Sequence, residues 1–90
     1  MTESAEESYQ RFTSFLDEQG YRLTQEREQI ARTVFSDERR FEAEELLYTL
    51  RRQGKNVSRA TIYRTLELLV NSGEVTKLSF EDGYSVYEVT

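Results

Sequence analysis

One stretch of the sequence, SRATIYRTLELLVNSGEV at residues 58–75, carries side chains suited to contacting a nucleic acid. A helix over this stretch, at about 100° per residue, turns Ile62 and Leu66 to one side. Its opposite side then carries Tyr63 and Arg64. Because arginine can bind guanine in the major groove of DNA, and apolar groups can contact the thymine methyl group, this outer side could read base edges.

The start of the same helix has residue types that bind phosphate. Ser58 is a favourable N-cap residue, and the backbone N–H groups of a first helical turn attract anions. Arg59 adds a positive charge beside them. The DNA contacts predicted in this helix come from Ser58, Arg59, Ala60, Thr61, Tyr63 and Arg64. The spacing also fits a structural alternative, in which Tyr63 packs at the edge of the core and Arg64 is merely solvated.

The sequence lacks the residues on which many enzymes and metal sites depend. It contains no Cys and no His, which excludes disulfides, thiolate metal sites and imidazole catalysis. Glu44 and Glu45 are adjacent, and adjacent side chains do not face each other on a helix, so they are interpreted as a solvated face. We therefore predict no enzyme activity, no catalytic residue, and no metal or cofactor bound by this chain.

Local signals divide the chain into helices followed by a hairpin. Helices are predicted over about 4–19, 25–35, 43–53 and 59–72. Alternating residues predict strands at about 75–80 and 85–89, joined by the turn EDGY at 81–84. A helix-turn-helix followed directly by a hairpin is a winged helix. The expected fold is mainly α with a small β-hairpin, in one domain over residues 1–90 with about four helices and a two-stranded antiparallel wing.

The charge of the chain leaves two functions open. The net charge is −5, whereas nucleic-acid-binding domains are usually basic. Residues 1–18 hold five acids and one base, but residues 46–66 hold five bases and no acid. Since physiological salt screens charges beyond about 8 Å, this local basic surface could still bind DNA. The alternative is a winged-helix protein–protein interaction module, whose acidic surface binds a partner.

The sequence also indicates where the protein works. No apolar stretch approaches the ~20 residues that a membrane-spanning helix needs. The first residues, MTESAEESYQ, are acidic and polar, unlike a signal peptide. We therefore expect a cytoplasmic protein that does not contact a membrane.

Four stretches together resemble the DNA-binding domain of the ferric uptake regulator (Fur) family: GYRLTQERE, FEAEELLYTLRRQG, SRATIYRTLELLVNSGEV and EDGYSVYEV. The resemblance extends from Asp17 to Val89, in the family's order and spacing. It implies a metal-responsive transcriptional regulator, which in most members is a dimeric repressor. The implied partner is double-stranded DNA that contains an A/T-rich palindromic operator.

The resemblance also implies roles for individual residues. Tyr63 and Arg64 match the residues that contact bases in the major groove. Arg22 matches a basic residue that reaches toward the minor groove, and Arg27 matches an arginine that contacts phosphate. From the residues alone both are ordinary: Arg22 adjoins a helix start, and Arg27 could simply pair with a neighbouring glutamate.

The sequence departs from the family in its metal ligands. The family's domain continues into a second domain that holds iron, zinc or manganese and forms the dimer interface, whereas this sequence ends at Thr90. Arg39, Arg40 and Phe41 occupy the neighbourhood where one family metal site has a His. Glu88 matches a metal-ligating Glu but lacks its partners. We therefore expect a monomer without metal, either a shortened form or a natural stand-alone domain.

Overall fold

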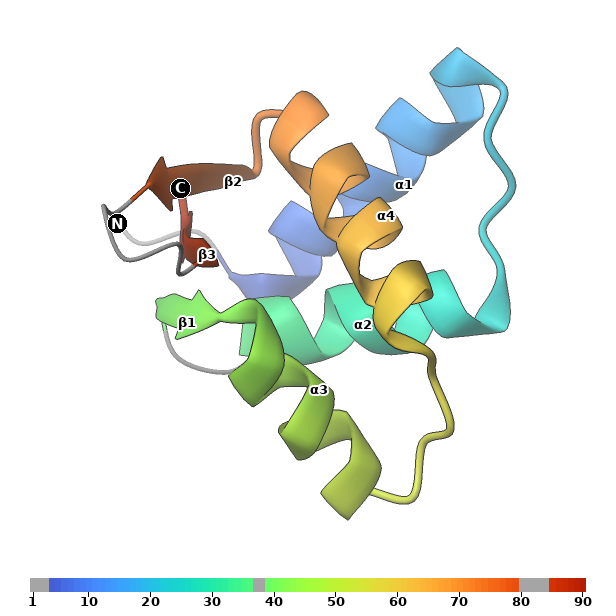
Figure 1. Cartoon of the computed structure of the whole chain (residues 1–90). Coiled ribbons are helices and arrows are strands. Elements are labelled where there is room, and N and C mark those ends of the chain that lie inside the picture. Colours follow the sequence, from blue (N-terminus) through green and yellow to red (C-terminus); the bar gives the residue numbers. More distant parts are fainter. Residues whose placement is uncertain (1–3, 37–38, 80–84) are drawn as a thin grey trace.

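The computed structural model describes residues 4–36, 39–79 and 85–90 (Figure 1). Within them the chain forms four helices and a small antiparallel sheet, as the sequence predicts. The helices are α1 (Ala5–Gln19), α2 (Gln25–Ser36), α3 (Ala43–Arg52) and α4 (Arg59–Asn71). The strands are β1 (Arg40–Glu42), β2 (Val75–Ser79) and β3 (Ser85–Val89). The predicted turn at 81–84, and Phe80 before it, lie outside the described residues.

The sheet has one strand more than the predicted two-stranded wing. Its order is β1-β3-β2, so that β3 pairs with β2 on one edge and with β1 on the other. In the β1–β3 pair Phe41 lies opposite Tyr87, and their rings stack with centroids 5.7 Å apart. The two predicted strands are present as β2 and β3, but β1 was not predicted. It has only three residues, too few for a periodic pattern, and forms by pairing with a distant part of the chain.

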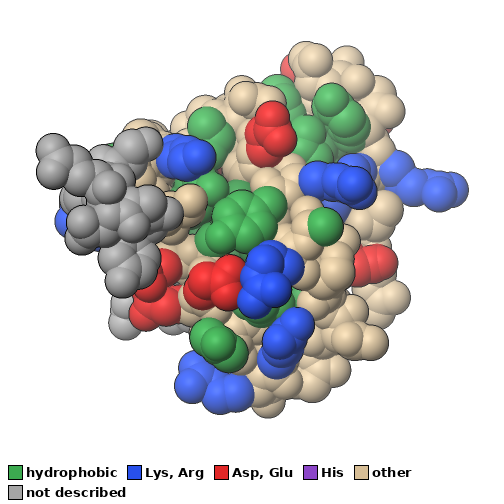
Figure 2. Space-filling model, in the orientation of Figure 1, with side chains coloured by type: hydrophobic (Ala, Val, Ile, Leu, Met, Phe, Trp, Pro, Cys, Tyr) green, Lys and Arg blue, Asp and Glu red, His purple; other side chains and the backbone are tan. Residues whose placement is uncertain are grey.

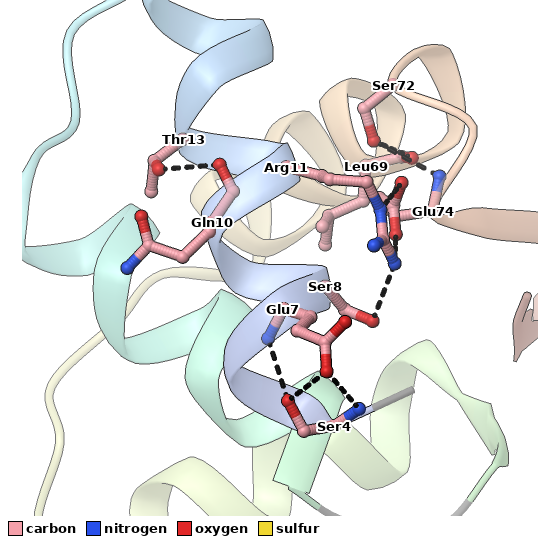
Figure 3. Close-up of polar contacts among 9 residues, drawn as sticks. All are labelled: Ser4, Glu7, Ser8, Gln10, Arg11, Thr13, Leu69, Ser72 and Glu74. Atoms are coloured by element: carbon pink, nitrogen blue, oxygen red, sulfur yellow. Dashed lines mark hydrogen bonds and ion pairs between the residues drawn. The ribbon is translucent and has the colours of Figure 1, made fainter. Parts of the chain in front are cut away.

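Polar caps define where the helices begin. Ser4 Oγ accepts a hydrogen bond from the Glu7 backbone N–H at 3.1 Å, and the Glu7 carboxylate accepts one from the Ser4 N–H in return (Figure 3). This reciprocal capping box satisfies two N–H groups that the start of α1 leaves unpaired. Gly20 caps the C-terminal end of α1, and its φ of 78° is a left-handed conformation that favours glycine.

The core lies where the four helices meet. Phe12 of α1, Ile30 of α2, Leu50 of α3 and Leu66 of α4 are all fully buried. α4 contacts both α2 and α3 and leads directly into β2. The side of α4 that faces away from the core belongs to the surface in Figure 2, where charged and hydrophobic side chains are interspersed.

An ion pair joins the first helix to the start of the sheet. Arg11 of α1 donates from Nε and Nη2 to the two carboxylate oxygens of Glu74, both at 2.9 Å (Figure 3). Arg11 also donates to Ser8 Oγ at 3.3 Å. The Glu74 side chain is only 13% exposed and lies just before β2. The pair therefore fixes the entry into the sheet against α1.

Leu66→Ala should lower the free energy of unfolding by about 2–5 kcal/mol, because it removes buried apolar contacts and leaves a cavity. Leu23 is the control, since it is 39% exposed, and Leu23→Ala should stay within about 0.5 kcal/mol of the wild type. Chemical denaturation of both variants measures the difference. Equal stability of the two variants would contradict the central position of Leu66.

Candidate nucleic-acid interface

The outer side of α4 carries the exposed residues that the sequence singles out. Ile62, Leu66 and Leu69 are at most 1% exposed, so they fix which side of the helix faces the core. Arg59 and Arg64 are exposed, and Tyr63 keeps 37% of its surface accessible. Arg64 makes no hydrogen bond or ion pair with any described residue, so its guanidinium is available to a ligand.

The first turn of α4 is ordered by its own hydroxyl groups. Ser58 Oγ accepts a hydrogen bond from the Thr61 backbone N–H at 3.1 Å and donates one to Thr61 Oγ1 at 2.9 Å. Ser58 is therefore the predicted N-cap, but its hydroxyl is engaged within the turn. Arg59 and Ala60 follow it, both exposed, at the positive end of the helix dipole.

Glu44, in the first turn of α3, binds two of the predicted contact residues. Arg59 donates from Nε and Nη2 to its two carboxylate oxygens at 3.0 and 2.9 Å, and the Tyr63 hydroxyl lies 3.5 Å from one of them. The hydrogen bonds from Arg59 lower the pKa of the Glu44 carboxyl. In Figure 2 acidic and basic side chains lie together beside an exposed hydrophobic one on this surface.

Glu44 is the residue of this interface that the sequence analysis missed. An acid in the first turn of a helix is the ordinary pattern that the helix dipole favours. The contact with Arg59 depends on the packing of α3 against α4, which no local pattern specifies. The only signal in the sequence is the opposite charge of two residues near the starts of successive helices.

The segment before α2 lies beside the outer side of α4. Thr24 Oγ1 accepts a hydrogen bond from the Arg27 backbone N–H at 3.1 Å, so Thr24 caps α2 as predicted. The Arg27 side chain pairs with neither adjacent glutamate. Instead it donates to the Arg22 backbone oxygen at 2.6 Å and lies over the Tyr21 ring, 5.8 Å from its centroid. Arg27 therefore holds the segment that carries the exposed Arg22 side chain.

Two shallow grooves connect this segment with α4. One is lined by Tyr21, Arg27, Arg64, Glu67, Leu68 and Asn71, and the other by Thr24, Glu26, Arg27, Thr61, Arg64 and Thr65. Arg27 and Arg64 line both grooves. The structure thus brings Arg27 and Arg64 together on one surface, with Arg22 held in the adjoining segment, although they are far apart in the sequence.

The described residues do not fit a metal site. Among residues 4–36, 39–79 and 85–90, no group of three or more Asp, Glu, His or Cys side chains is placed to hold a metal ion. Glu88 instead accepts hydrogen bonds from Arg40 across the β1–β3 pair, at 2.9 Å from Nη2 and 3.3 Å from Nε. A carboxylate neutralised by a guanidinium group in this way is a poor ligand for a cation.

Residues 18–90 match the model of the Ferric uptake regulator family. The chain belongs to this family. It is 35% identical over 75 residues to the ferric uptake regulation protein of Bacillus subtilis, covering 82% of this chain and 50% of that protein. It is 38% identical over 68 residues to the zinc uptake regulation protein of Mycobacterium tuberculosis, covering 76% and 52%.

Solved structures of Fur proteins share the winged-helix fold of this chain. The ferric uptake regulator of Vibrio cholerae superposes with a TM-score of 0.72 at 32% identity, covering 83% of this chain and 58% of that one. The regulator of Pseudomonas aeruginosa, solved with manganese, gives a TM-score of 0.73 at 31% identity, covering 86% and 58%. The family and fold inferred from the sequence are therefore confirmed.

This Fur-family chain and its relatives differ in length. The chain spans about half the length of the curated relatives it matches. Those relatives are named as regulators of metal uptake and not as enzymes. In the part of the chain that the structure describes, every helix is too short or too polar to span a bilayer.

Arg59→Gln should raise the pKa of the Glu44 carboxyl toward its ordinary value, because the hydrogen bonds that lower it are lost. An NMR titration of the glutamate carboxyl groups measures the midpoint. Glu6 is the matched control, since a hydrogen bond from Arg32 lowers its pKa in the same way, and its midpoint should not move.

The lowered pKa of Glu44 also determines how the stability of the fold depends on pH. Because the folded state lowers the pKa of Glu44, the ion pair contributes stability above the ordinary pKa of glutamate. This contribution is lost as the pH falls through the lowered pKa of the folded protein. An unchanged Glu44 midpoint in the Arg59→Gln variant would show that the pair does not persist in solution.

Proposed function

We propose that this chain is the DNA-binding domain of a metal-responsive transcriptional repressor, and that α4 enters the major groove of an operator. The observation that carries the proposal is the outer side of α4, where Tyr63 and Arg64 are exposed while the inner side is buried. A major groove admits one helix, and the donors of an arginine can pair with the O6 and N7 atoms of guanine. Membership of the Fur family supports the same conclusion.

The other predicted contact residues fit supporting roles. The backbone N–H groups of Arg59 and Ala60 begin the helix, where such groups have no intrahelical partner and can bind phosphate. Thr61 lines a groove beside Arg64, and Ser58 acts through the cap that orders this turn. Arg22 extends from the segment before α2, where an arginine can enter a narrow, A/T-rich minor groove.

Arg27 has a different role in this proposal from the one its family match implies. Its guanidinium already binds the Arg22 backbone oxygen and lies over Tyr21. Five N–H donors are available in arginine, so the same group can hold this segment and still donate to a phosphate. Arg27 therefore positions Arg22 as well as contacting the DNA backbone.

The complete regulator is proposed to be a dimer on a palindromic operator. The match covers only about half of each of these relatives, and we assign the response to iron, zinc or manganese, and the dimer interface, to such additional sequence. The 90-residue chain alone should be monomeric and bind DNA weakly, since linking two binding modules can raise affinity by about 10²–10⁴. A regulator of bacterial genes of this kind works in the cytoplasm, where the chromosome lies.

Arg64→Ala should weaken binding to the preferred duplex by about 1–3 kcal/mol and relax the preference at one base pair. Its effect on folding should stay within about 0.5 kcal/mol, because Arg64 is a surface residue. Arg32→Gln is the control: it removes the same charge from the part of α2 where Arg32 contacts Glu6 and the Tyr9 ring of α1. Fluorescence anisotropy with duplexes selected from a randomised library measures both variants.

A salt titration separates the proposal from its alternative. If phosphate contacts contribute to binding, the logarithm of the affinity should fall with the logarithm of salt concentration, by about 0.9 per contact. Unchanged affinity and base preference in Arg64→Ala would contradict the reading role of α4. Complete absence of salt-sensitive DNA binding would favour the protein–protein interaction module that the net charge of −5 suggests.

A further inference from the structure

We propose that Glu44 restrains the Arg59 side chain and so limits the phosphate contacts that this surface makes with DNA. The inference rests on the proposed function and adds a regulating residue to the same surface. Glu44 is an acid placed among the side chains that would face DNA, where its charge opposes binding. Its contacts explain why an acid at this position is compatible with a DNA-binding surface.

The geometry ties Arg59 to Glu44 through one edge of the guanidinium. Both carboxylate oxygens are occupied, one by Nε at 3.0 Å and the other by Nη2 at 2.9 Å. A phosphate group pairs with arginine through two parallel hydrogen bonds of the same kind. A DNA phosphate must therefore displace Glu44 to use this edge of Arg59, or bind through the remaining donors at an angle that Glu44 constrains.

The ion pair between Arg59 and Glu44 contributes little to the stability of the fold. The Arg59 and Glu44 side chains are 57% and 44% exposed, and an exposed ion pair contributes little to folding. The ion pair between Arg11 and Glu74 is different, because the Glu74 side chain is largely buried against α1. The Arg59–Glu44 pair lies instead on the surface of the predicted interface, with Tyr63 close to the same carboxylate.

The restraint acts on phosphate contacts, which DNA of every sequence offers. Binding to unrelated DNA comes almost entirely from phosphate contacts, so restraining one arginine removes part of what a small domain has available. Binding to an operator also includes base contacts from Tyr63 and Arg64. Arg64 has no partner among the described residues, so Glu44 does not restrain it. Glu44 therefore weakens the phosphate contribution by a similar factor on both kinds of DNA and leaves base contact by Arg64 unaffected.

Glu44→Gln tests this directly with the 90-residue chain and a pool of random-sequence 25-base-pair duplexes. Releasing one phosphate contact should raise the affinity for this pool about five- to tenfold at 0.1 M salt and steepen the salt dependence by about 0.9. The affinity for a duplex that the wild-type chain enriches from a randomised library should rise by a similar factor, because the same phosphate contact is released.

Two further variants separate this effect from a general change of charge. Glu45→Gln removes the same charge one residue away, where the side chain accepts a hydrogen bond from the Glu42 N–H and not from Arg59. Glutamine can keep that bond, so Glu45→Gln should leave the salt dependence unchanged. In an Arg59→Gln background, Glu44→Gln should have no more effect than Glu45→Gln, because the arginine that it releases is absent.

The binding measurements distinguish failure of the proposed function from failure of the inference about Glu44. If the wild-type chain binds no duplex, the proposed function fails and the inference with it. If the wild-type chain binds DNA but Glu44→Gln behaves like Glu45→Gln, or its effect persists without Arg59, only the inference is overturned. Weaker binding by Glu44→Gln would also overturn it, since Glu44 would then orient Arg59 toward DNA. Thermal melts of all variants confirm that each remains folded.

Discussion

Burial of one side of α4 is the constraint on which the rest of the molecule depends. Ile62, Leu66 and Leu69 are removed from water almost completely, and each such side chain contributes about 1.5–3 kcal/mol when fully buried. This burial also fixes which side of α4 faces the core. A helix held along one side cannot rotate about its axis without exposing these residues. The positions of Tyr63 and Arg64 on the surface are therefore set by buried aliphatic residues on the opposite side of the helix.

The sequence was sufficient wherever a local signal determines the structure. Gly20, Thr24 and Ser58 each act within one turn of their own position, and the helix boundaries at these residues were predicted correctly. β1 was not predictable in this way, because its partner β3 lies far along the chain. The ion pair of Glu44 with Arg59 was not predicted for the same reason: a solvated glutamate with an ion-pair partner and one without have the same local pattern.

The sequence likewise predicts which residues form the candidate site, but not the contacts that hold them. Periodicity placed Tyr63 and Arg64 on the outer side of α4, and the family resemblance supplied Arg22 and Arg27. What the sequence could not supply is how these arginines are held. Arg27 is fixed by a backbone oxygen and an aromatic ring, and Arg59 by a carboxylate of another helix. Such contacts depend on distances between packed helices, so only the three-dimensional structure separates a restrained arginine from an available one.

The buried residues of α1 show that the folding unit includes this helix. The family match begins at residue 18, whereas α1 ends one residue later at Gln19 and supplies the buried Phe12 and Leu16. Arg11 of the same helix also holds Glu74. The start of the family-model match therefore falls inside the hydrophobic core, and a fragment cut at residue 18 would lose the buried side chains that α1 supplies.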